Sequence, residues 1–308
     1  MTYVTIANCP VCLSKNRDIY YKGTAGNHLN KTMDFTNYMC TASSYGRYFD
    51  LMKCRDCQLI YASIRPSEET LEDAYSKIED HIYLEEESGR IKTFSRALRE
   101  LNRFCPGKGQ MFELGSYTGV FLELAQKDGW KIDGVELSRW ARGIALKTRG
   151  IPLRGSMDLI ALSDHGTYDS VVIWDVIEHV PAPLRMIKQA VNLLKPGGVL
   201  GLSTMVLDSI SARLLREKYP FLMEMHLIYF TRKTLLDLLK QCGLEILEYK
   251  RHTRFVSYLY LLSRIKQMDF IYNNPRLAGV LKKQFVQLSA GIRDVYARKK
   301  ISQPWRKS

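Results

Sequence analysis

The stretch MFELGSYTGVFLE, residues 111–123, decides the fold class of this chain. An apolar run leads into a turn bounded by Gly115 and Gly119, and an amphipathic run follows it. This pattern predicts a strand at 111–114, a turn at 115–119, and a helix that ends at Gly129. Glycines let a backbone approach a ligand because they carry no Cβ. Such a turn is a weak nucleotide-binding signal alone, so the rest of the chain has to support it.

Strands and helices alternate on both sides of this turn's helix. The sequence predicts further strands at 130–137, 151–155, 168–177, 199–204, 244–250 and 292–300, and helices at 138–150, 183–198 and 231–243. Alternation of this kind indicates parallel strands joined by crossover helices. We therefore expect an α/β fold: a Rossmann-like, doubly wound, mostly parallel seven-stranded sheet, with a small N-terminal zinc-ribbon module and a helical insert near the C-terminus.

Two acidic residues and one tyrosine indicate which nucleotide the turn binds. Glu136 ends the second predicted strand, 21 residues after Gly115, where a carboxylate can accept both ribose hydroxyls. A dinucleotide site needs a middle glycine for its pyrophosphate, and Tyr117 stands in that place. S-adenosylmethionine (SAM) carries no phosphate, and Glu113 could serve its ammonium through water or through backbone positioning. The sequence therefore favours SAM over a dinucleotide.

Four of the seven cysteines form two CxxC pairs, Cys9 with Cys12 and Cys54 with Cys57. Each CxxC turn can supply two thiolates to a tetrahedral zinc ion. Paired motifs of this kind indicate metal binding before disulfides in a chain without an export signal, and a redox role is the alternative. Four cysteines leave no open coordination position, so we expect structural Zn²⁺.

Pro66, Ser67 and the two glutamates that follow mark a helix start, and the apolar spacing continues to about residue 104. We therefore expect three parts: a zinc-binding module at 1–65, linker helices at 66–105 that cover the cofactor site, and the α/β domain at 106–308. A helical, aromatic-rich insert is expected at about 255–288.

The formal charge of +13 is concentrated near the C-terminus. Residues 250–308 hold 14 Lys or Arg against two Asp, a surplus of +12, which leaves about +1 for the rest. This asymmetry suits nucleic acid, lipid head groups or a phosphate-bearing substrate, and equally a solvated surface without a partner. No signal peptide and no membrane-spanning apolar run is evident, so we expect a cytoplasmic protein.

Taken together, these motifs resemble the class I SAM-dependent methyltransferases over residues from about 85 to 250. ELGSYTG is similar to the family's first motif, GVELS to its acidic second-strand motif, RGSMDLI to its adenine-contacting segment, and YDSVVIWDVIEHVPAP to its fourth-strand motif. The family usually has glycine where Tyr117 stands. The resemblance implies the following cofactor-binding residues: Glu113, Gly115, Ser116, Tyr117, Thr118, Gly119, Glu136, Leu137, Ser156, Met157, Trp174 and Asp175.

The N-terminal segment resembles the small zinc-binding module of bacterial methyltransferases that act on sugars and other secondary metabolites. Methyl transfer to a hydroxyl or a carbon acid needs a nearby base, and histidine has a suitable pKa. His179 directly follows the fourth strand, and His226 would come from the opposite wall. Glu178 completes the candidate catalytic set. For each histidine, a structural role is an equal alternative.

The spacing Asp175-x-x-Glu178-His179 also resembles ubiquinone-pathway O-methyltransferases, some of which hold a divalent cation there. A hard cation would polarise a hydroxyl. The sequence thus predicts a SAM-dependent methyltransferase acting on a hydroxyl or carbon of a sugar, a sugar nucleotide or a related metabolite. The alternatives are an RNA-modifying or RNA-binding protein and an NAD-dependent oxidoreductase.

Overall fold

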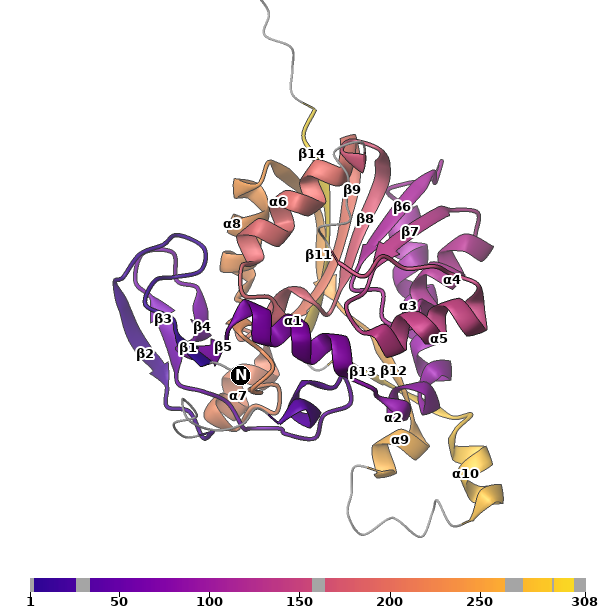
Figure 1. The fold of residues 1–308 in the computed structure, drawn as a ribbon, viewed down its shortest axis with the longest axis horizontal. Coiled ribbons are helices and arrows are strands. Elements are labelled where there is room, and N and C mark those ends of the chain that lie inside the picture. The colour runs from indigo at the N-terminus through magenta and orange to yellow at the C-terminus, as the bar shows by residue number, and fades with distance from the viewer. Residues whose placement is uncertain (1–2, 26–33, 157–163, 264–273, 290, 302–308) are drawn as a thin grey trace, which may run out of the picture.

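A six-stranded, mostly parallel sheet forms the centre of the computed structural model, which describes residues 3–25, 34–156, 164–263, 274–289 and 291–301 (Figure 1). Its strand order is β11-β14-β9-β8-β6-β7. The strands are β6 (Gln110–Leu114), β7 (Lys131–Val135), β8 (Tyr168–Trp174), β9 (Leu194–Met205), β11 (Leu244–Arg251) and β14 (Ile292–Lys299). The order reverses at β6, so the carboxyl ends of β6 and β8 lie at a topological switch point, where such sheets bind ligands.

Strand β14 runs antiparallel to both of its neighbours, β9 and β11, whereas the pairs among β7, β6, β8 and β9 are parallel. The seventh strand expected at 151–155 shortens to one parallel bridge between Val135 and Arg154. The main chain of Arg154 donates to Gly134 O and accepts from Glu136 N, and its side chain pairs with Asp133 of β7. In the described residues the sheet therefore has six strands where seven were expected.

Helices cover both faces of the sheet (Figure 1). On one face lie α6 (Pro183–Leu193) and α8 (Arg232–Gln241), and on the other α3 (Glu87–Asn102), α4 (Val120–Lys127) and α5 (Arg139–Arg149). The expected caps are present: Ser138 Oγ accepts from Ala141 N at 3.0 Å and begins α5. Helix α5 matches the sequence prediction closely because its cap and Gly150 bound it. Helix α6 was expected at 183–198 but ends at Leu193, because β9 begins at Leu194 and includes the Pro-Gly-Gly segment that was expected to stop the helix.

The linker region contains three helices, α1 (Glu68–Lys77), α2 (His81–Glu85) and α3. Ser67 caps α1, as its position before two glutamates predicts. The break before α2 centres on Asp80, which is fully buried, caps α2 through Tyr83 N and accepts two hydrogen bonds from Thr41. A long-range partner thus ends a helix that local spacing alone would continue.

The N-terminal module shares a sheet with the methyltransferase-like part of the chain. Its strands are β1 (Tyr3–Thr5), β2 (Arg17–Tyr21), β3 (Leu51–Cys54), β4 (Ile60–Ala62) and β5 (Ile64–Pro66), and a 3-10 turn, η1, covers Phe35–Tyr38. A short strand, β10 (Ile228–Tyr229), adds antiparallel to β4. One hydrophobic core runs from the module into the central sheet.

The C-terminal insert is a mixed unit, although a helical one was expected. It contains β12 (Arg254–Ser257), α9 (Tyr258–Ser263), α10 (Pro275–Leu281) and β13 (Phe285–Leu288), with β12 antiparallel to β13. Strand β12 is held extended because Phe255 N donates to Thr93 Oγ1 and Ser257 N to buried Glu86. The remaining elements are η4 (Ile177–His179), α7 (Ile210–Leu215) and η5 (Arg216–Lys218). None of the helices in the described ranges is long and apolar enough to cross a membrane.

Candidate active site and cysteine cluster

The turn at 115–119 joins β6 to α4, as predicted. Gly115 and Gly119 have φ values of +80° and +78°, a region that side chains rarely adopt. A Cβ on Gly115 would lie 2.6 Å from Val176 Cγ2. Ser116 is buried, and its hydroxyl donates to Glu113 O at 3.2 Å. Both glycines are therefore required by the shape of this turn.

Tyr117 takes a left-handed conformation, with φ of +47°. The backbone thus follows the path that a glycine would permit, although a bulky side chain is present. The ring lies edge-on to Tyr83 of α2, with centroids 4.3 Å apart, and 6.1 Å from Trp140 of α5. The tyrosine therefore links the turn to the linker helices above it.

Glu136 lies directly beside this turn. Its Oε2 accepts from Tyr117 N at 2.8 Å and its Oε1 from Ser138 N at 2.7 Å. Burial raises the pKa of its carboxyl group, although the hydrogen bonds from these amides oppose that shift. Each carboxylate oxygen has two lone pairs, so both retain acceptor capacity toward a ribose.

Three buried polar atoms in or beside the turn have no hydrogen-bond partner in the described residues, namely Glu113 Oε2, Tyr117 Oη and Thr118 Oγ1. Burial raises the pKa of Glu113 well above its usual range. Buried polar groups are normally satisfied, so unmatched ones at a switch point fit the polar portion of a bound cofactor. These residues fit SAM, but they do not by themselves select it.

The remaining residues that were predicted to bind the cofactor differ in their burial and in their neighbours. Leu137 is half-buried, and its carbonyl accepts from Arg142 at 2.8 Å. Ser156 is half-buried just beyond the Val135–Arg154 bridge, whereas Met157 lies outside the described residues. Trp174 packs edge-on against Phe121 in the core, with ring centroids 5.3 Å apart. The packing of Trp174 gives it a core role that the sequence did not anticipate.

Asp175 follows β8, and each of its carboxylate oxygens accepts a hydrogen bond from a protein group. Its Oδ1 accepts from Ser203 Oγ at 2.7 Å, and its Oδ2 accepts from Arg254 Nη2 at 2.5 Å. Burial would raise the pKa of Asp175, but Arg254, His252 and the hydrogen bond from Ser203 together outweigh burial, so the pKa is lowered. This carboxylate is therefore poorly placed to be a metal ligand.

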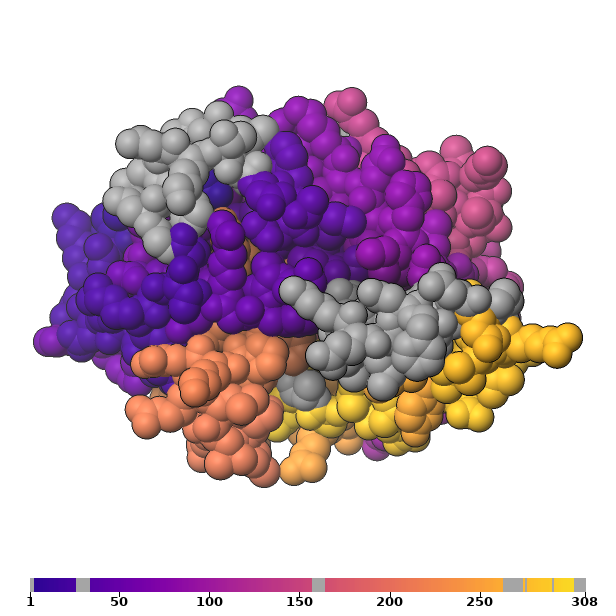
Figure 2. Space-filling view, turned by 90° about the horizontal axis from the view of Figure 1, so that it is seen from below, coloured from indigo at the N-terminus to yellow at the C-terminus, as the bar shows by residue number. Residues whose placement is uncertain are grey.

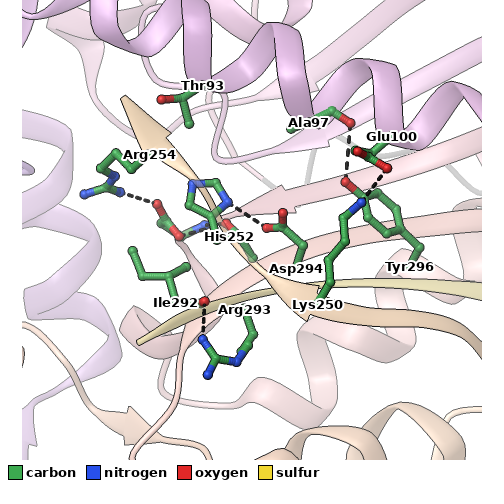
Figure 3. Close-up of polar contacts among 12 residues, drawn as sticks. Thr93, Ala97, Glu100, Lys250, His252, Arg254, Ile292, Arg293, Asp294 and Tyr296 are labelled. Atoms are coloured by element: carbon green, nitrogen blue, oxygen red, sulfur yellow. Dashed lines mark hydrogen bonds and ion pairs between the residues drawn. The ribbon is translucent and has the colours of Figure 1, made fainter. Parts of the chain in front are cut away.

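Arg254 reaches Asp175 from the insert, and the same wall contains a buried pair formed by His252 and Asp294 (Figure 3). His252 Nδ1 lies 2.7 Å from Asp294 Oδ1. Sequence reasoning missed Arg254 because the segment looked helical. Its only signal was membership of the basic C-terminal surplus.

Glu178, His179 and His226 come together although the sequence separates them by 47 positions. Their ligand atoms all lie within 4.8 Å of one another, and the two imidazole centroids are 4.8 Å apart. Glu178 Oε2 accepts from Thr204 Oγ1 at 2.9 Å, and burial together with Asp175 raises its pKa to about 8. Both predicted catalytic histidines therefore occupy one cluster with Glu178.

The hydrogen bonds of the two histidines define their tautomers. His179 Nδ1 lies 3.1 Å from Met225 O, and His226 Nδ1 lies 2.7 Å from Phe221 O. A carbonyl only accepts, so each Nδ1 carries the proton and each Nε2 offers a lone pair. Burial lowers the pKa of His179 to about 4 and that of His226 to about 3. Both rings are therefore neutral near pH 7.

The four predicted zinc ligands also form a cluster, with all four sulfurs within 4.8 Å of one another. Cys9 Sγ and Cys57 Sγ are 3.5 Å apart, as are those of Cys12 and Cys54. A tetrahedral zinc–thiolate site places its sulfurs about 3.8 Å apart, since the Zn–S bond is about 2.3 Å. The spacing of these thiols fits a structural zinc ion.

The two CxxC turns have the same backbone geometry. Leu13 and Gln58, which follow the second cysteine of each turn, both have positive φ values, +64° and +66°. In each turn this residue's N–H donates to the first cysteine's carbonyl at 3.0 Å. The repeated shape, from segments about 40 residues apart, supports a shared metal and not a redox pair.

The N-terminal module binds the segment that contains His226. Glu224 is buried and accepts hydrogen bonds from Tyr3, at 3.3 Å, and from Arg47, at 3.0 Å. Two residues beyond His226, β10 begins and pairs with β4. The module therefore supports the wall of the candidate site as well as the linker helices, where Thr41 binds Asp80 before α2.

Three of the basic residues near the C-terminus interact with other groups of the protein. Lys250 pairs with Glu100 and Glu248, Arg254 with Asp175, and Lys299 Nζ donates to two carbonyls at the end of α6 (Figure 3). The surplus in sequence thus overstates the free positive charge of this segment.

A family model described as a methyltransferase domain matches residues 83–249, just over half of the chain. The chain therefore belongs to the methyltransferase-domain family, and the resemblance to class I SAM-dependent methyltransferases is confirmed. The family match is to a methyltransferase, which leaves the NAD-dependent oxidoreductase without support.

Two curated relatives are ubiquinone biosynthesis O-methyltransferases. The one from Albidiferax ferrireducens is 27% identical over 116 residues, which cover 35% of this chain and 46% of the relative. The one from Burkholderia pseudomallei (strain 1710b) is 25% identical over 159 residues, which cover 47% of this chain and 68% of the relative. The first alignment thus spans less than half of the relative's length.

Similar solved structures include a SAM-dependent methyltransferase of Thermotoga maritima, described as a possible histamine N-methyltransferase. It is 21% identical, with a TM-score of 0.46 and coverage of 68% of this chain and 89% of that one. A phosphoethanolamine N-methyltransferase of Haemonchus contortus, in complex with phosphomonomethylethanolamine and S-adenosylhomocysteine, is 15% identical, with a TM-score of 0.44 and coverage of 67% and 52%.

Proposed function

We propose that this protein transfers the methyl group of SAM to a hydroxyl or a carbon acid of a small molecule, with His179 and His226 as the bases. The observation that carries the proposal is the pair of neutral imidazoles, each with an unprotonated Nε2, whose rings lie 4.8 Å apart in one cluster at the carboxyl end of β8. A base at this place can take the acceptor's proton as the methyl group is transferred.

The cofactor would lie along the turn between β6 and α4. The carboxylate of Glu136 would accept from the ribose hydroxyls, and Glu113 and Thr118 would face the polar methionine portion. Sulfonium is already a good leaving group, so placement of the acceptor in line with the methyl supplies much of the rate. Tyr83, packed on Tyr117, would help to exclude water from this place.

The acceptor we propose is a sugar, a sugar nucleotide or a related metabolite, as the N-terminal module's resemblance implies. The relatives' descriptions as O-methyltransferases favour a hydroxyl over a carbon. Arg254, which pairs with Asp175 and is partly exposed, suits an acceptor with an anionic group. Nucleic acid remains an alternative partner, although the internal pairing of the basic segment counts against it.

Two metal sites belong to the proposal. Structural Zn²⁺ would be held by Cys9, Cys12, Cys54 and Cys57. A divalent cation is a second candidate at the active site, where Glu178, His179 and His226 would be the ligands and His226 would replace Asp175. Two imidazoles and one carboxylate suit a transition metal better than Mg²⁺, and such an ion would polarise a bound hydroxyl.

A methyl-transfer assay on a panel of sugars, sugar nucleotides and phenols, with S-adenosylhomocysteine as the detected product, tests the proposal. We expect His226→Asn and His179→Asn each to lower kcat about 100-fold or more, the usual contribution of a general base. Exposed His81 is the control, and His81→Asn should leave kcat unchanged. Loss of activity with a chelator, restored by a transition metal, would assign the histidines to a cation; full activity in both variants would refute both roles.

A further inference from the structure

Helix α7 (Ile210–Leu215) exposes three large apolar side chains. Ile210 is 67% exposed, Leu214 is 78% and Leu215 is 44%. Ile210 and Leu214 are four residues apart and so lie on one face of the helix. Scattered exposed leucines are normal, but three within one short segment form an apolar patch.

Basic side chains surround this patch. Arg213, Arg216 and Lys218 are all exposed, against the single acid Glu217 in the same segment. None of the three basic residues takes part in an ion pair with a described acidic side chain. The segment is therefore both apolar and positively charged at its surface.

A second segment repeats this combination. Helix α10 exposes Leu277 and Val280, and Arg276, Lys282 and Lys283 beside them are exposed as well. Figure 1 places α7 and α10 at the same end of the molecule, below the central sheet. In Figure 2, which views that end, the orange segment that contains α7 and the yellow segment that contains α10 lie on one face.

This face is also the one that the candidate site adjoins. Helix α7 begins five residues after Met205, the end of β9, and Thr204 of β9 contacts Glu178. Helix α10 belongs to the insert whose first strand supplies Arg254 to Asp175. Helix α7 is thus a short continuation of one wall of the site, and α10 belongs to the insert that contributes to another wall.

We propose that α7 and α10 dock this face of the protein onto an anionic lipid surface. Apolar side chains can enter the boundary between head groups and acyl chains, and each nearby Lys or Arg adds attraction to anionic lipids. With no membrane-spanning helix in the described residues, such contact would be peripheral. The docking would bring the acceptor-binding end toward the lipid, which suits an amphiphilic acceptor; only this last point rests on the proposed methyl transfer.

Charge favours a lipid surface over the other occupants. A symmetric dimer through this face would bring Arg213, Arg216 and Lys218 opposite their own copies, and like charges facing each other are unfavourable. Nucleic acid would satisfy the basic side chains, but it would leave the aliphatic ones of α7 without apolar contacts. An anionic bilayer satisfies both sets at once.

Vesicle flotation with the full chain tests the docking, with phosphatidylcholine vesicles that contain or lack about one third phosphatidylglycerol. We expect binding to the anionic vesicles only, weakening with salt. The double variant Ile210→Ser, Leu214→Ser should lower the partition coefficient about tenfold or more. The matched control is Leu146→Ser on α5, where Leu146 is also exposed; it should bind as the wild type does.

Several outcomes would overturn the docking: no binding to anionic vesicles, equal binding by the double variant, or an equal loss in the control. A dimer that the double variant dissociates, seen by sedimentation velocity, would assign the patch to self-association. Binding of S-adenosylhomocysteine, measured on every variant, shows that the fold is intact. Vesicle binding without any cofactor binding would refute the proposed methyl transfer and leave the docking in place.

Discussion

Replacing Glu136 with glutamine removes the ribose-facing carboxylate but keeps its size. In the structure both carboxylate oxygens already accept from turn amides, Oε2 from Tyr117 N and Oε1 from Ser138 N. A glutamine has one acceptor oxygen, so its NH₂ group would face one of these amides. The change therefore disturbs the turn and removes the charge that a ribose hydroxyl would meet.

The size of the effect follows from these contacts. A hydrogen bond to a charged group contributes about 1.5–3 kcal/mol, and about 1.4 kcal/mol is a tenfold change in Kd. We expect Glu136→Gln to weaken S-adenosylhomocysteine binding by about tenfold or more. Loss of an amide partner should also lower the free energy of unfolding, by about 1–3 kcal/mol.

Isothermal titration calorimetry with S-adenosylhomocysteine measures the change in affinity, and chemical denaturation measures the change in stability. The control is Glu245→Gln, which removes the same charge from an exposed position on β11, at the opposite edge of the sheet from β7. Equal affinity of Glu136→Gln and the wild type would show that Glu136 does not hold the ribose. An equal loss in Glu245→Gln would show that net charge is responsible.

Three further changes test separate parts of the structure. Gly115→Ala places a side chain at a left-handed φ and a Cβ 2.6 Å from Val176 Cγ2. We therefore expect the free energy of unfolding to fall by about 2 kcal/mol or more, measured by thermal unfolding, and an unchanged Tm would contradict this expectation. Cys54→Ser should lower zinc content and stability together, measured by metal analysis and melting, and full stability without zinc would count against the proposed site. Burial raises the pKa of Glu178 to about 8 from 4.5, so the contribution of Glu178 to the free energy of unfolding falls as pH rises between these two values. We expect Glu178→Gln to reduce this pH dependence, measured by chemical denaturation at a series of pH values. An unchanged pH dependence would show that another group causes it.

The sequence predicted those parts of the fold that local signals control. The β6 turn, helix α5 and the final strand lie where glycines, caps and apolar spacing predicted them, whereas α6 ends five residues before its predicted end. The two CxxC pairs also predicted that the four cysteines would lie together, because the two-residue spacing within each pair is typical of tetrahedral zinc sites. Glu178, His179 and His226 were expected to form one catalytic set, but nothing local indicated that their ligand atoms would lie within 4.8 Å of one another.

What the sequence could not predict depends on long-range partners. Asp80 ends a helix because it binds Thr41, and β12 is extended because α2 and α3 provide its hydrogen bonds. The salt bridge from Arg254 to Asp175 crosses 79 positions. This pairing makes Asp175 a poor candidate for the metal-binding role that the motif had suggested.

The supporting role of the N-terminal module was hidden for the same reason. The antiparallel pairing of β10 with β4 involves only two residues from each strand, too few for a periodic pattern. The sequence around Glu224 does not indicate its partners Tyr3 and Arg47, which lie more than 170 residues earlier in the chain.

A crystal structure of the protein with S-adenosylhomocysteine tests the central claim most directly, because it relates the cofactor to the proposed bases. We predict ribose hydroxyls on Glu136 and a sulfur atom that faces the Nε2 atoms of His179 and His226. Cofactor bound with its sulfur directed away from both histidines, or held at a different part of the sheet, would contradict the proposed mechanism.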